Sequence, residues 1–298
     1  TIKNNQNEAT KTERGIYMSF DKVQADRLAV KIRKNILRAI ASEGKGHIGG
    51  SLSIADTFAV LYSGVAKVDP ADPGKADRDF VVMSKGHCGP AMYAVLAAKG
   101  FFPEEALDTL NKGNTILPSH TDRLKTPGVD ISTGSLGQGA SLAAGAALAD
   151  KLDGKTSYIY MILGDGELDE GQVWESALFA AHHKLDHLIT FVDVNGKQLD
   201  GPTDQVCCLG SIEDKFKAFG YHVVSVQNGN DTGQIYQAIQ EAKAVKDKPS
   251  VILLHTVKGA GIRYYEEMAN CHSTEVKKEN LPDFYQELDR RLKEKEEA

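Results

Sequence analysis

Apolar residues recur at helical spacing in several stretches of the chain. Between Val23 and Glu43 they include Leu28, Ile32, Ile36 and Ile40, each four residues after the last. Because this spacing places them on one face of a helix, it predicts a long amphipathic helix. The same reasoning predicts further helices over residues 53–64, 93–100, 140–149, 173–183, 211–219, 233–245 and 281–298.

Short continuous apolar runs lie between these helical stretches. They cover residues 80–83, 158–163, 188–192, 221–226 and 250–257. Apolar runs that alternate with helices indicate right-handed βαβ units around a buried parallel sheet. The sequence therefore predicts an α/β fold, a parallel β-sheet with helices on both faces.

The chain shows no internal repeat and no low-complexity linker. We therefore expect a single domain over residues 21–298, ending in a charged helix that packs only lightly. Residues 1–20 are polar, and we interpret them as a flexible N-terminal extension.

Composition narrows the class of ligand. The formal net charge of −6 is spread along the chain, without the basic stripe that nucleic-acid binding requires. Binding of a small anion remains compatible with this net charge, since backbone N–H groups and a metal can hold the anion locally. No apolar run approaches the roughly 20 residues of a membrane span, and the first 18 residues lack a signal-peptide core. The four cysteines form no C-x-x-C pair, so we expect a reducing, cytoplasmic setting.

Two polar residues each follow a predicted strand. Asp165 and Asn195 end successive apolar runs, so both are expected at the carboxyl edge of the sheet, where ligands bind. Carboxylate and amide oxygens are hard ligands suited to Mg²⁺ or Ca²⁺, and the glycines Gly164 and Gly166 allow close approach of an anion. Asp-Gly and Asn-Gly are also favoured turn dipeptides. Their repetition in consecutive βαβ units favours a site over two simple turns.

A second glycine cluster runs from Gly134 to Gly139 and precedes a helix of small residues. A dinucleotide-binding interpretation is weak, because no strand clearly precedes the cluster. The start of the helix can offer free N–H groups to an anion. The small residues equally indicate a tight helix contact, and both interpretations stay open.

Four histidines lie in loops, namely His47, His87, His120 and His272. Loop histidines are more often solvated than functional, but His47 and His87 each follow a Lys-Gly pair directly after a predicted helix or strand, where ligand-binding loops emerge. No histidine spacing matches a zinc site.

The stretch from Gly164 to Gly171, followed by Asp193 to Gly196, resembles the thiamine diphosphate fingerprint, in which GDG precedes an asparagine by nearly thirty residues. Five further motifs narrow the resemblance to transketolases over about residues 20–275. They are Gly46-His47, Ser84-Lys85-Gly86-His87, Thr133 to Gly139, Gln198-Leu199-Asp200-Gly201 and Thr256-Val257-Lys258-Gly259. The resemblance implies the thiamine diphosphate-binding fold of a diphosphate-binding domain.

The resemblance also implies a role for each matched residue. Asp165 and Asn195 would bind Mg²⁺, or Ca²⁺ as a substitute, through side-chain oxygens, and Lys197 through its carbonyl. The remaining cofactor contacts would come from His87, Gly134, Ser135, Leu136, Gly166, Glu170, Lys258 and His272. Glu170 would join a carboxylate network between paired active sites. His47, His120 and His272 would be catalytic, since proton transfer at sugar hydroxyls needs groups that titrate near neutral pH.

Two features depart from the family. Ile48 stands where the G-H-P motif has proline, and the sequence stops before the pyrimidine-binding and C-terminal domains of full-length transketolases. We therefore expect a subunit of a split transketolase, inactive alone and completed by a separately encoded C-terminal subunit in an α2β2 heterotetramer. It would transfer a two-carbon ketol unit from a ketose phosphate to an aldose phosphate, as in the pentose phosphate pathway.

Two alternatives remain at this point. One is the α-subunit of a 2-oxoacid dehydrogenase, or a deoxyxylulose-phosphate synthase-like half, although the loop histidines favour sugar substrates. The other is a non-catalytic scaffold, against which the intact Asp165, Asn195 and Lys258 argue.

Overall fold

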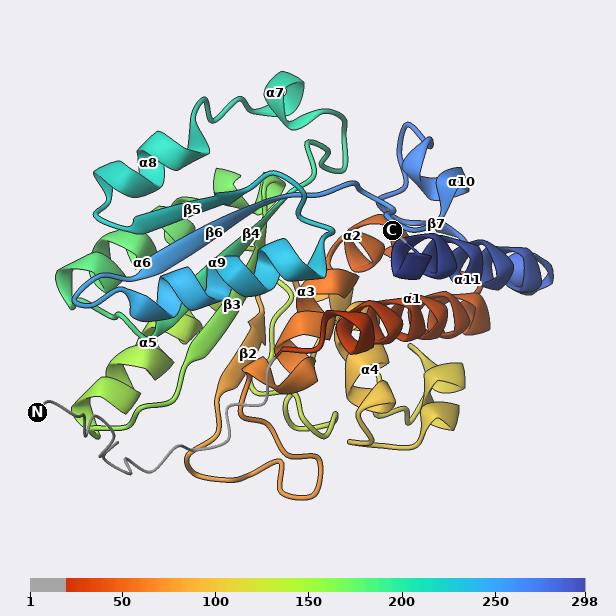
Figure 1. Ribbon diagram of the computed structural model, residues 1–298, viewed down its shortest axis with the longest axis horizontal. Coiled ribbons are helices and arrows are strands. Elements are labelled where there is room, and N and C mark those ends of the chain that lie inside the picture. Colours follow the sequence, from red (N-terminus) through yellow and green to blue (C-terminus); the bar gives the residue numbers. More distant parts are fainter. Residues whose placement is uncertain (1–19, 298) are drawn as a thin grey trace, which may run out of the picture.

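A central parallel sheet of five strands organises the chain (Figure 1). The fold comes from a computed structural model that describes residues 20–297, so the predicted extension over residues 1–20 falls almost wholly outside the described residues. The strand order is β2-β3-β4-β6-β5, and every neighbouring pair is parallel. The strands are β2 (Phe80–Met83), β3 (Ile159–Gly164), β4 (Leu188–Val194), β5 (His222–Val226) and β6 (Ser250–His255).

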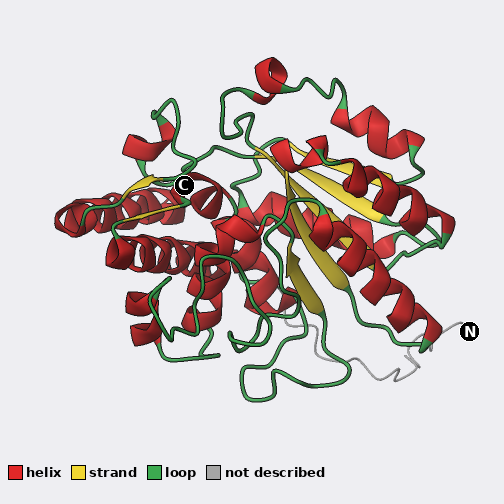
Figure 2. Cartoon of the chain, turned by 180° about the vertical axis from the view of Figure 1, so that it is seen from behind, coloured by secondary structure: helices red, strands yellow, loops and turns green. Residues whose placement is uncertain are grey.

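Helices cover both faces of this sheet, as Figure 2 shows from behind. The α/β prediction is therefore confirmed. The longer helices are α1 (Lys22–Glu43), α4 (Gly89–Ala98), α5 (Gln138–Leu152), α6 (Gly171–His182), α8 (Ile212–Ala218), α9 (Thr232–Ala244) and α11 (Leu281–Glu297).

Side chains that alternate along each strand form two separate cores. On β3, Tyr160 and Ile162 pack with α1, α4 and α9, whereas Met161 and Leu163 pack with α5 and α6. Because both faces are buried, the strands appear in the sequence as continuous apolar runs rather than as alternating ones.

One predicted helix is broken into three pieces. The stretch over residues 53–64 belongs to α2 (Ile48–Ser53), α3 (Ala55–Val60) and the π-helical turn η1 (Leu61–Val65). Gly64 has φ of 105°, a conformation that favours glycine and ends the helix. Helical spacing alone does not mark such breaks, since the apolar stripe continues across them.

Several short elements were not predicted. A two-stranded antiparallel ribbon joins β1 (Lys45–Gly46) to β7 (Thr274–Glu275). Strands of two residues carry no periodic signal. The other short elements are α7 (Thr203–Val206), α10 (Arg263–Glu266), η2 (Gly86–Cys88), η3 (Glu104–Thr109), η4 (Gly166–Asp169) and η5 (Lys278–Asn280).

The terminal helix α11 packs along α1, which corrects the expectation of light packing (Figure 1). Phe284 and Leu288 are buried at 8% and 2% exposure. Lys34 on α1 pairs with Asp289 on α11 at 2.6 Å. Although most of its residues are charged, α11 therefore packs on the rest of the chain through two buried apolar side chains, Phe284 and Leu288.

In the part of the chain that the structure describes, no helix combines the length and apolar character needed to cross a bilayer.

Candidate functional site

A cavity of about 180 Å³ opens at the carboxyl ends of the strands. It lies where the ends of β3 and β4 and the segment after β6 meet α2 (Ile48–Ser53). Eight of the residues singled out from the sequence line it, namely His87, Leu136, Asp165, Gly166, Asn195, Lys197, Lys258 and His272. Parallel pairing of β3 with β4 brings Asp165 and Asn195 to the same edge.

Asp165 is a buried carboxylate whose oxygens face backbone amides. Oδ1 accepts from the Gly166 N–H at 2.9 Å, and Oδ2 accepts from the Gly196 N–H at 2.6 Å. Burial, followed by the nearby charge of Asp193, raises the pKa of Asp165 to about 6. A bound cation would offset both effects, because it stabilises the charged carboxylate.

The other two predicted metal ligands lie in the turn after β4. Asn195 Oδ1 accepts from the Lys197 N–H at 3.2 Å, and the Lys197 carbonyl accepts from Lys258 Nζ at 2.6 Å. Burial lowers the pKa of Lys258. Its ammonium group also lies 3.4 Å from His272 Nδ1.

The residues of the cavity fit a hard cation and an anion. The predicted ligand atoms are all oxygens, namely those of the Asp165 carboxylate, the Asn195 side-chain amide and the Lys197 carbonyl. Oxygens are the ligands that Mg²⁺ prefers. Gln198 also lines the cavity, and its Nε2 is buried with no hydrogen-bond partner among the described residues. A buried N–H donor without an acceptor in the protein is expected where a bound anion supplies the acceptor oxygen.

The four loop histidines come together beside this cavity. Ring centroids lie 5.1 Å apart for His47 and His87, 5.3 Å for His47 and His272, and 4.9 Å for His87 and His272. His120 is more distant, 6.3 Å from His47, and faces a separate shallow hollow. Four segments far apart in the sequence therefore contribute to one cluster.

These imidazoles are neutral at neutral pH. Burial and the neighbouring His87 and His120 lower the pKa of His47 to about 4, and burial with the Lys85 charge lowers that of His87 to about 4. Burial, His87 and Lys258 lower the pKa of His272 to about 3. The pKa of His120 is lowered as well, chiefly by burial.

Besides His47 and His120, three predicted residues lie outside the cavity wall, namely Gly134, Ser135 and Glu170. Gly134 adjoins His120, since a Cβ on Gly134 would lie 3.5 Å from that ring. Ser135 and Glu170 are exposed. Glu170 flanks Gly137, where a Cβ would lie 2.9 Å from the Glu170 Cβ. None of these three residues lines the cavity.

The second glycine cluster makes a tight contact with the segment after β2. A Cβ on Gly86 would lie 2.7 Å from the Gly134 nitrogen, and one on Gly139 would lie 2.5 Å from Ser84 Oγ. No strand leads into this cluster among the described residues 110–133. The close-contact interpretation is therefore supported over the dinucleotide one.

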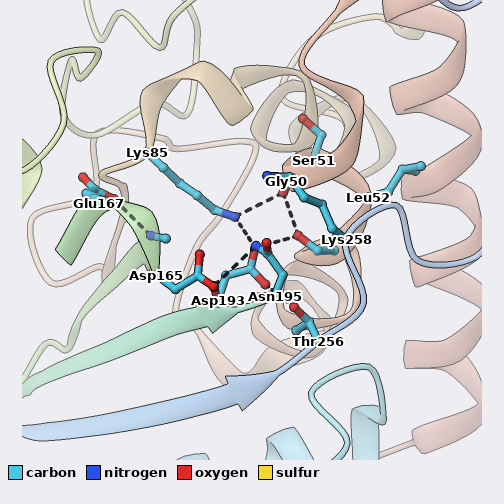
Figure 3. A network of polar contacts seen from close by, with 12 residues as sticks. Gly50, Ser51, Leu52, Lys85, Asp165, Glu167, Asp193, Asn195, Thr256 and Lys258 are labelled. Atoms are coloured by element: carbon cyan, nitrogen blue, oxygen red, sulfur yellow. Dashed lines mark hydrogen bonds and ion pairs between the residues drawn. The ribbon is translucent and has the colours of Figure 1, made fainter. Parts of the chain in front are cut away.

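Two buried carboxylates beside the cavity were not singled out from the sequence. Glu167 Oε1 accepts from Ser84 Oγ at 2.6 Å and from the Gly137 N–H at 2.9 Å, while Oε2 accepts from the Gly164 N–H at 3.1 Å. Asp193 pairs with Lys85 at 2.5 Å (Figure 3). Asp193 could have been identified from the sequence, because it is a charged residue inside an otherwise apolar strand.

No group of three His, Cys, Asp or Glu side chains within residues 20–297 is arranged to hold a metal ion. The predicted site does not require one, because two of its three ligands are an amide and a backbone carbonyl. The four cysteines, which include buried Cys88 and Cys271, are all free thiols.

Known proteins share both the sequence and the fold. The profile of the transketolase, thiamine diphosphate binding domain family matches residues 24–291. A 6-deoxy-6-sulfo-D-fructose transketolase subunit of a Clostridium species is 49% identical over 88% of this chain and 95% of its own length. An apulose-4-phosphate transketolase subunit of Phocaeicola vulgatus is 36% identical, with 88% and 92% coverage.

Solved transketolases are similar in structure. The enzyme of Leishmania mexicana superposes with a TM-score of 0.83 at 31% identity, over 89% of this chain and 41% of its own. A Pichia stipitis transketolase gives 0.84 at 28% identity, over 91% and 41%. The chain thus spans about two fifths of these enzymes, but nearly the whole of the separate subunits. It belongs to the transketolase family, through the thiamine diphosphate-binding domain that it shares with the subunits of split transketolases.

Proposed function

We propose that the chain is the diphosphate- and Mg²⁺-binding subunit of a split transketolase. With a separate C-terminal subunit, it would transfer a two-carbon ketol unit from a ketose phosphate to an aldose phosphate. The observation that carries this proposal is the meeting of Asp165, Asn195 and the Lys197 carbonyl in one cavity at adjacent strand ends. We also propose that residues 21–298 act as one domain.

In this proposal three oxygens hold Mg²⁺, or Ca²⁺ in its place. They are a carboxylate oxygen of Asp165, Oδ1 of Asn195 and the carbonyl of Lys197. His87 and the Gly166 backbone receive the diphosphate, and the unpartnered Gln198 Nε2 lies on the same wall. The cofactor supplies carbanion stabilisation when bound, and the protein supplies position and surroundings.

The histidine cluster would act on substrate hydroxyls. Since the pKa values of His47 and His272 are about 4 and about 3, their rings are neutral and can both donate and accept hydrogen bonds. Neutral rings can form hydrogen bonds with sugar hydroxyls, but these pKa values contradict the expectation from the sequence that His47 and His272 titrate near neutral pH. They cannot supply positive charge for an anionic end of the sugar.

Substrates of the two subunit relatives carry such an end, a sulfonate in one name and a phosphate in the other. We propose the same class for this chain, a ketose with a terminal anionic group. The three lysines that line the cavity each have an acceptor: Lys85 donates to Asp193, Lys197 to the Met268 carbonyl and Lys258 to the Lys197 carbonyl. The partner subunit is therefore expected to provide the cationic contacts, in an α2β2 assembly placed in the cytoplasm.

Replacing Asp165 by alanine tests the metal assignment. In the complex with the C-terminal subunit, Asp165→Ala should abolish Mg²⁺-dependent binding of thiamine diphosphate, measured by calorimetry. The matched control is Asp169→Ala, an exposed carboxylate in the same turn, which should bind as wild type does. Unchanged affinity in Asp165→Ala would refute the metal site.

The reaction class is tested with substrates. The assembled pair should convert xylulose 5-phosphate with ribose 5-phosphate, or a sulfonated ketose donor, and should not turn over pyruvate. Turnover of pyruvate alone would instead support a 2-oxoacid enzyme, and no turnover of any donor would support a scaffold.

A further inference from the structure

Asp193 is a fully buried carboxylate that lies behind the cavity wall, at 0% exposure. It has four side-chain donors from four segments of the chain, and Figure 3 labels three of them, Lys85, Asn195 and Thr256. Its Oδ2 accepts from Lys85 Nζ at 2.5 Å, Ser53 Oγ at 2.6 Å and Asn195 Nδ2 at 3.0 Å, while Oδ1 accepts from Thr256 Oγ1. The metal and cofactor contacts proposed above give this buried carboxylate no role.

The contact with Asn195 determines which end of an amide faces the cavity. An asparagine amide has a donor end and an acceptor end of nearly equal size, and it rotates easily between them. A carboxylate can only accept, so it captures Nδ2. Oδ1 is then directed to the other side, where it accepts from the Lys197 N–H at 3.2 Å. Charge-assisted hydrogen bonds are about twice as strong as neutral ones, which makes this orientation firm.

We propose that Asp193 is a positioning residue that fixes the Asn195 amide with its oxygen toward the cation site. The inference rests on the proposed function, since it concerns a ligand of the proposed metal. With the amide reversed, an NH₂ group would face the cation, and one of its three protein oxygens would be lost.

Lys85 stabilises the buried charge of Asp193 in the protein interior. Its ammonium group is 2% exposed and donates to Asp193 and to the Gly50 carbonyl at 3.2 Å. Without a partner, a buried carboxylate would cost several kcal/mol of desolvation. Asp193 therefore presents a charged carboxylate to Asn195, while the opposite charge of Lys85 leaves the pair without a net charge.

The alternative is that Asp193 and Lys85 form a purely structural pair. Two double variants separate these roles, Asp193→Leu/Lys85→Met and Asp193→Asn/Lys85→Met. Both remove the ion pair. Asparagine has nearly the size of aspartate, and leucine has its branched shape with two larger methyl groups. Apolar or neutral replacements of buried pairs are often tolerated, so both should fold. Asparagine retains an oxygen that can accept from Asn195 Nδ2, whereas leucine leaves this amide and the Ser53 and Thr256 hydroxyls without that acceptor.

The probe is Mn²⁺ titrated into the full chain with thiamine diphosphate, with free Mn²⁺ followed by electron paramagnetic resonance. Loss of an outer partner of a metal ligand typically costs about 10- to 100-fold in affinity. We expect the leucine variant to bind about 10- to 100-fold more weakly than the asparagine variant, at similar melting temperatures. Equal affinities of two folded variants would overturn the inference.

A measurement on the wild-type chain does not depend on the folding of any variant. Hydrogen exchange of the Asn195 side-chain amide, followed by NMR, should be slow compared with exposed Asn114. Fast exchange with Mn²⁺ binding intact would refute the positioning role alone. A protected amide in a chain that takes up no Mn²⁺ with thiamine diphosphate, even in complex with the C-terminal subunit, would refute the proposed function and leave the amide orientation standing.

Discussion

At the scale of single residues, the site is defined by charges that the interior suppresses or pairs. Its histidines are held neutral, Asp165 is shifted toward protonation, and Asp193 is held charged. Burial alone would raise the pKa of Asp193, but Lys85, Ser53 and Thr256 bring it below its ordinary value. Two neighbouring carboxyl groups thus have pKa values shifted in opposite directions, because each shift depends on burial and on which partner lies within a few ångströms.

The depressed pKa of His47 makes stability depend on pH. The pKa is about 4 in the folded chain and 6.5 in the unfolded one, so between these values the unfolded state binds more protons. Acidification from pH 6.5 toward 4 therefore destabilises the fold, and above pH 6.5 this effect is absent. After allowance for the partial exposure of His47, we expect a contribution of about 1 kcal/mol.

Thermal melts of the chain without cofactor check this expectation. Between pH 7.5 and 5 the melting temperature of wild type should fall by more than that of His47→Gln. The control is His182→Gln, an exposed position on α6, which should follow wild type. Parallel curves for wild type and His47→Gln would contradict the assignment.

At the scale of elements, the contact between α5 and the end of β2 sets the spacing of the loops around the cavity. A Cβ on Gly139 would lie 2.5 Å from Ser84 Oγ and 2.7 Å from Ser84 Cα. Ser84 in turn donates to Glu167, which bonds the Gly137 and Gly164 amides. The glycine therefore permits an approach that connects three loops through one buried carboxylate.

Two alanine substitutions in α5 should have opposite effects. Gly139→Ala should lower the free energy of unfolding by about 1–3 kcal/mol, because the extra methyl group overpacks against backbone. Gly145→Ala meets nothing within 4 Å and should raise it by about 0.5–1 kcal/mol, since alanine favours the helix. Urea denaturation measures both, and a Gly139→Ala chain as stable as wild type would show that the contact is loose.

At the scale of the whole molecule, the cavity collects residues from both halves of the chain. Residues of α2 and of the segments after β2, after β3, after β4 and after β6 all contribute to its wall. Figure 3 shows several of them close together. A ligand that contacts all of them binds the folded state and not the unfolded one. Its binding energy is then added to the stability of the entire sheet.

Saturation with Mg²⁺ and thiamine diphosphate should therefore stabilise the chain. At a ligand concentration of 100 times Kd we expect about 2.7 kcal/mol, which corresponds to a rise of about 4 °C in Tm for a chain of this size. Addition of EDTA should reverse the rise, and Asp165→Ala should show none. A rise that persists in EDTA would mean that the cofactor binds without the metal.

The sequence by itself determined the strands of the sheet, most of its helices and the polar residues at the carboxyl edge of the sheet. The reason is that these signals are local. An apolar run marks a buried strand, helical spacing marks a covering helix, and the polar residue directly after a strand in a parallel sheet lies at the carboxyl edge. The boundaries of β2 and the placement of Asp165 and Asn195 follow from neighbours along the chain.

Only the tertiary structure decided which distant groups meet. Lys85 and Asp193 are 108 residues apart, Lys258 reaches the Lys197 carbonyl across 61, and the four histidines come from four loops. The ribbon of β1 and β7 and the packing of α11 on α1 also depend on such encounters. A charge state depends on burial and on partners in space, and neither is encoded in a local pattern. For that reason the chemical character of the site, neutral histidines beside a fixed buried ion pair, became visible only in the fold.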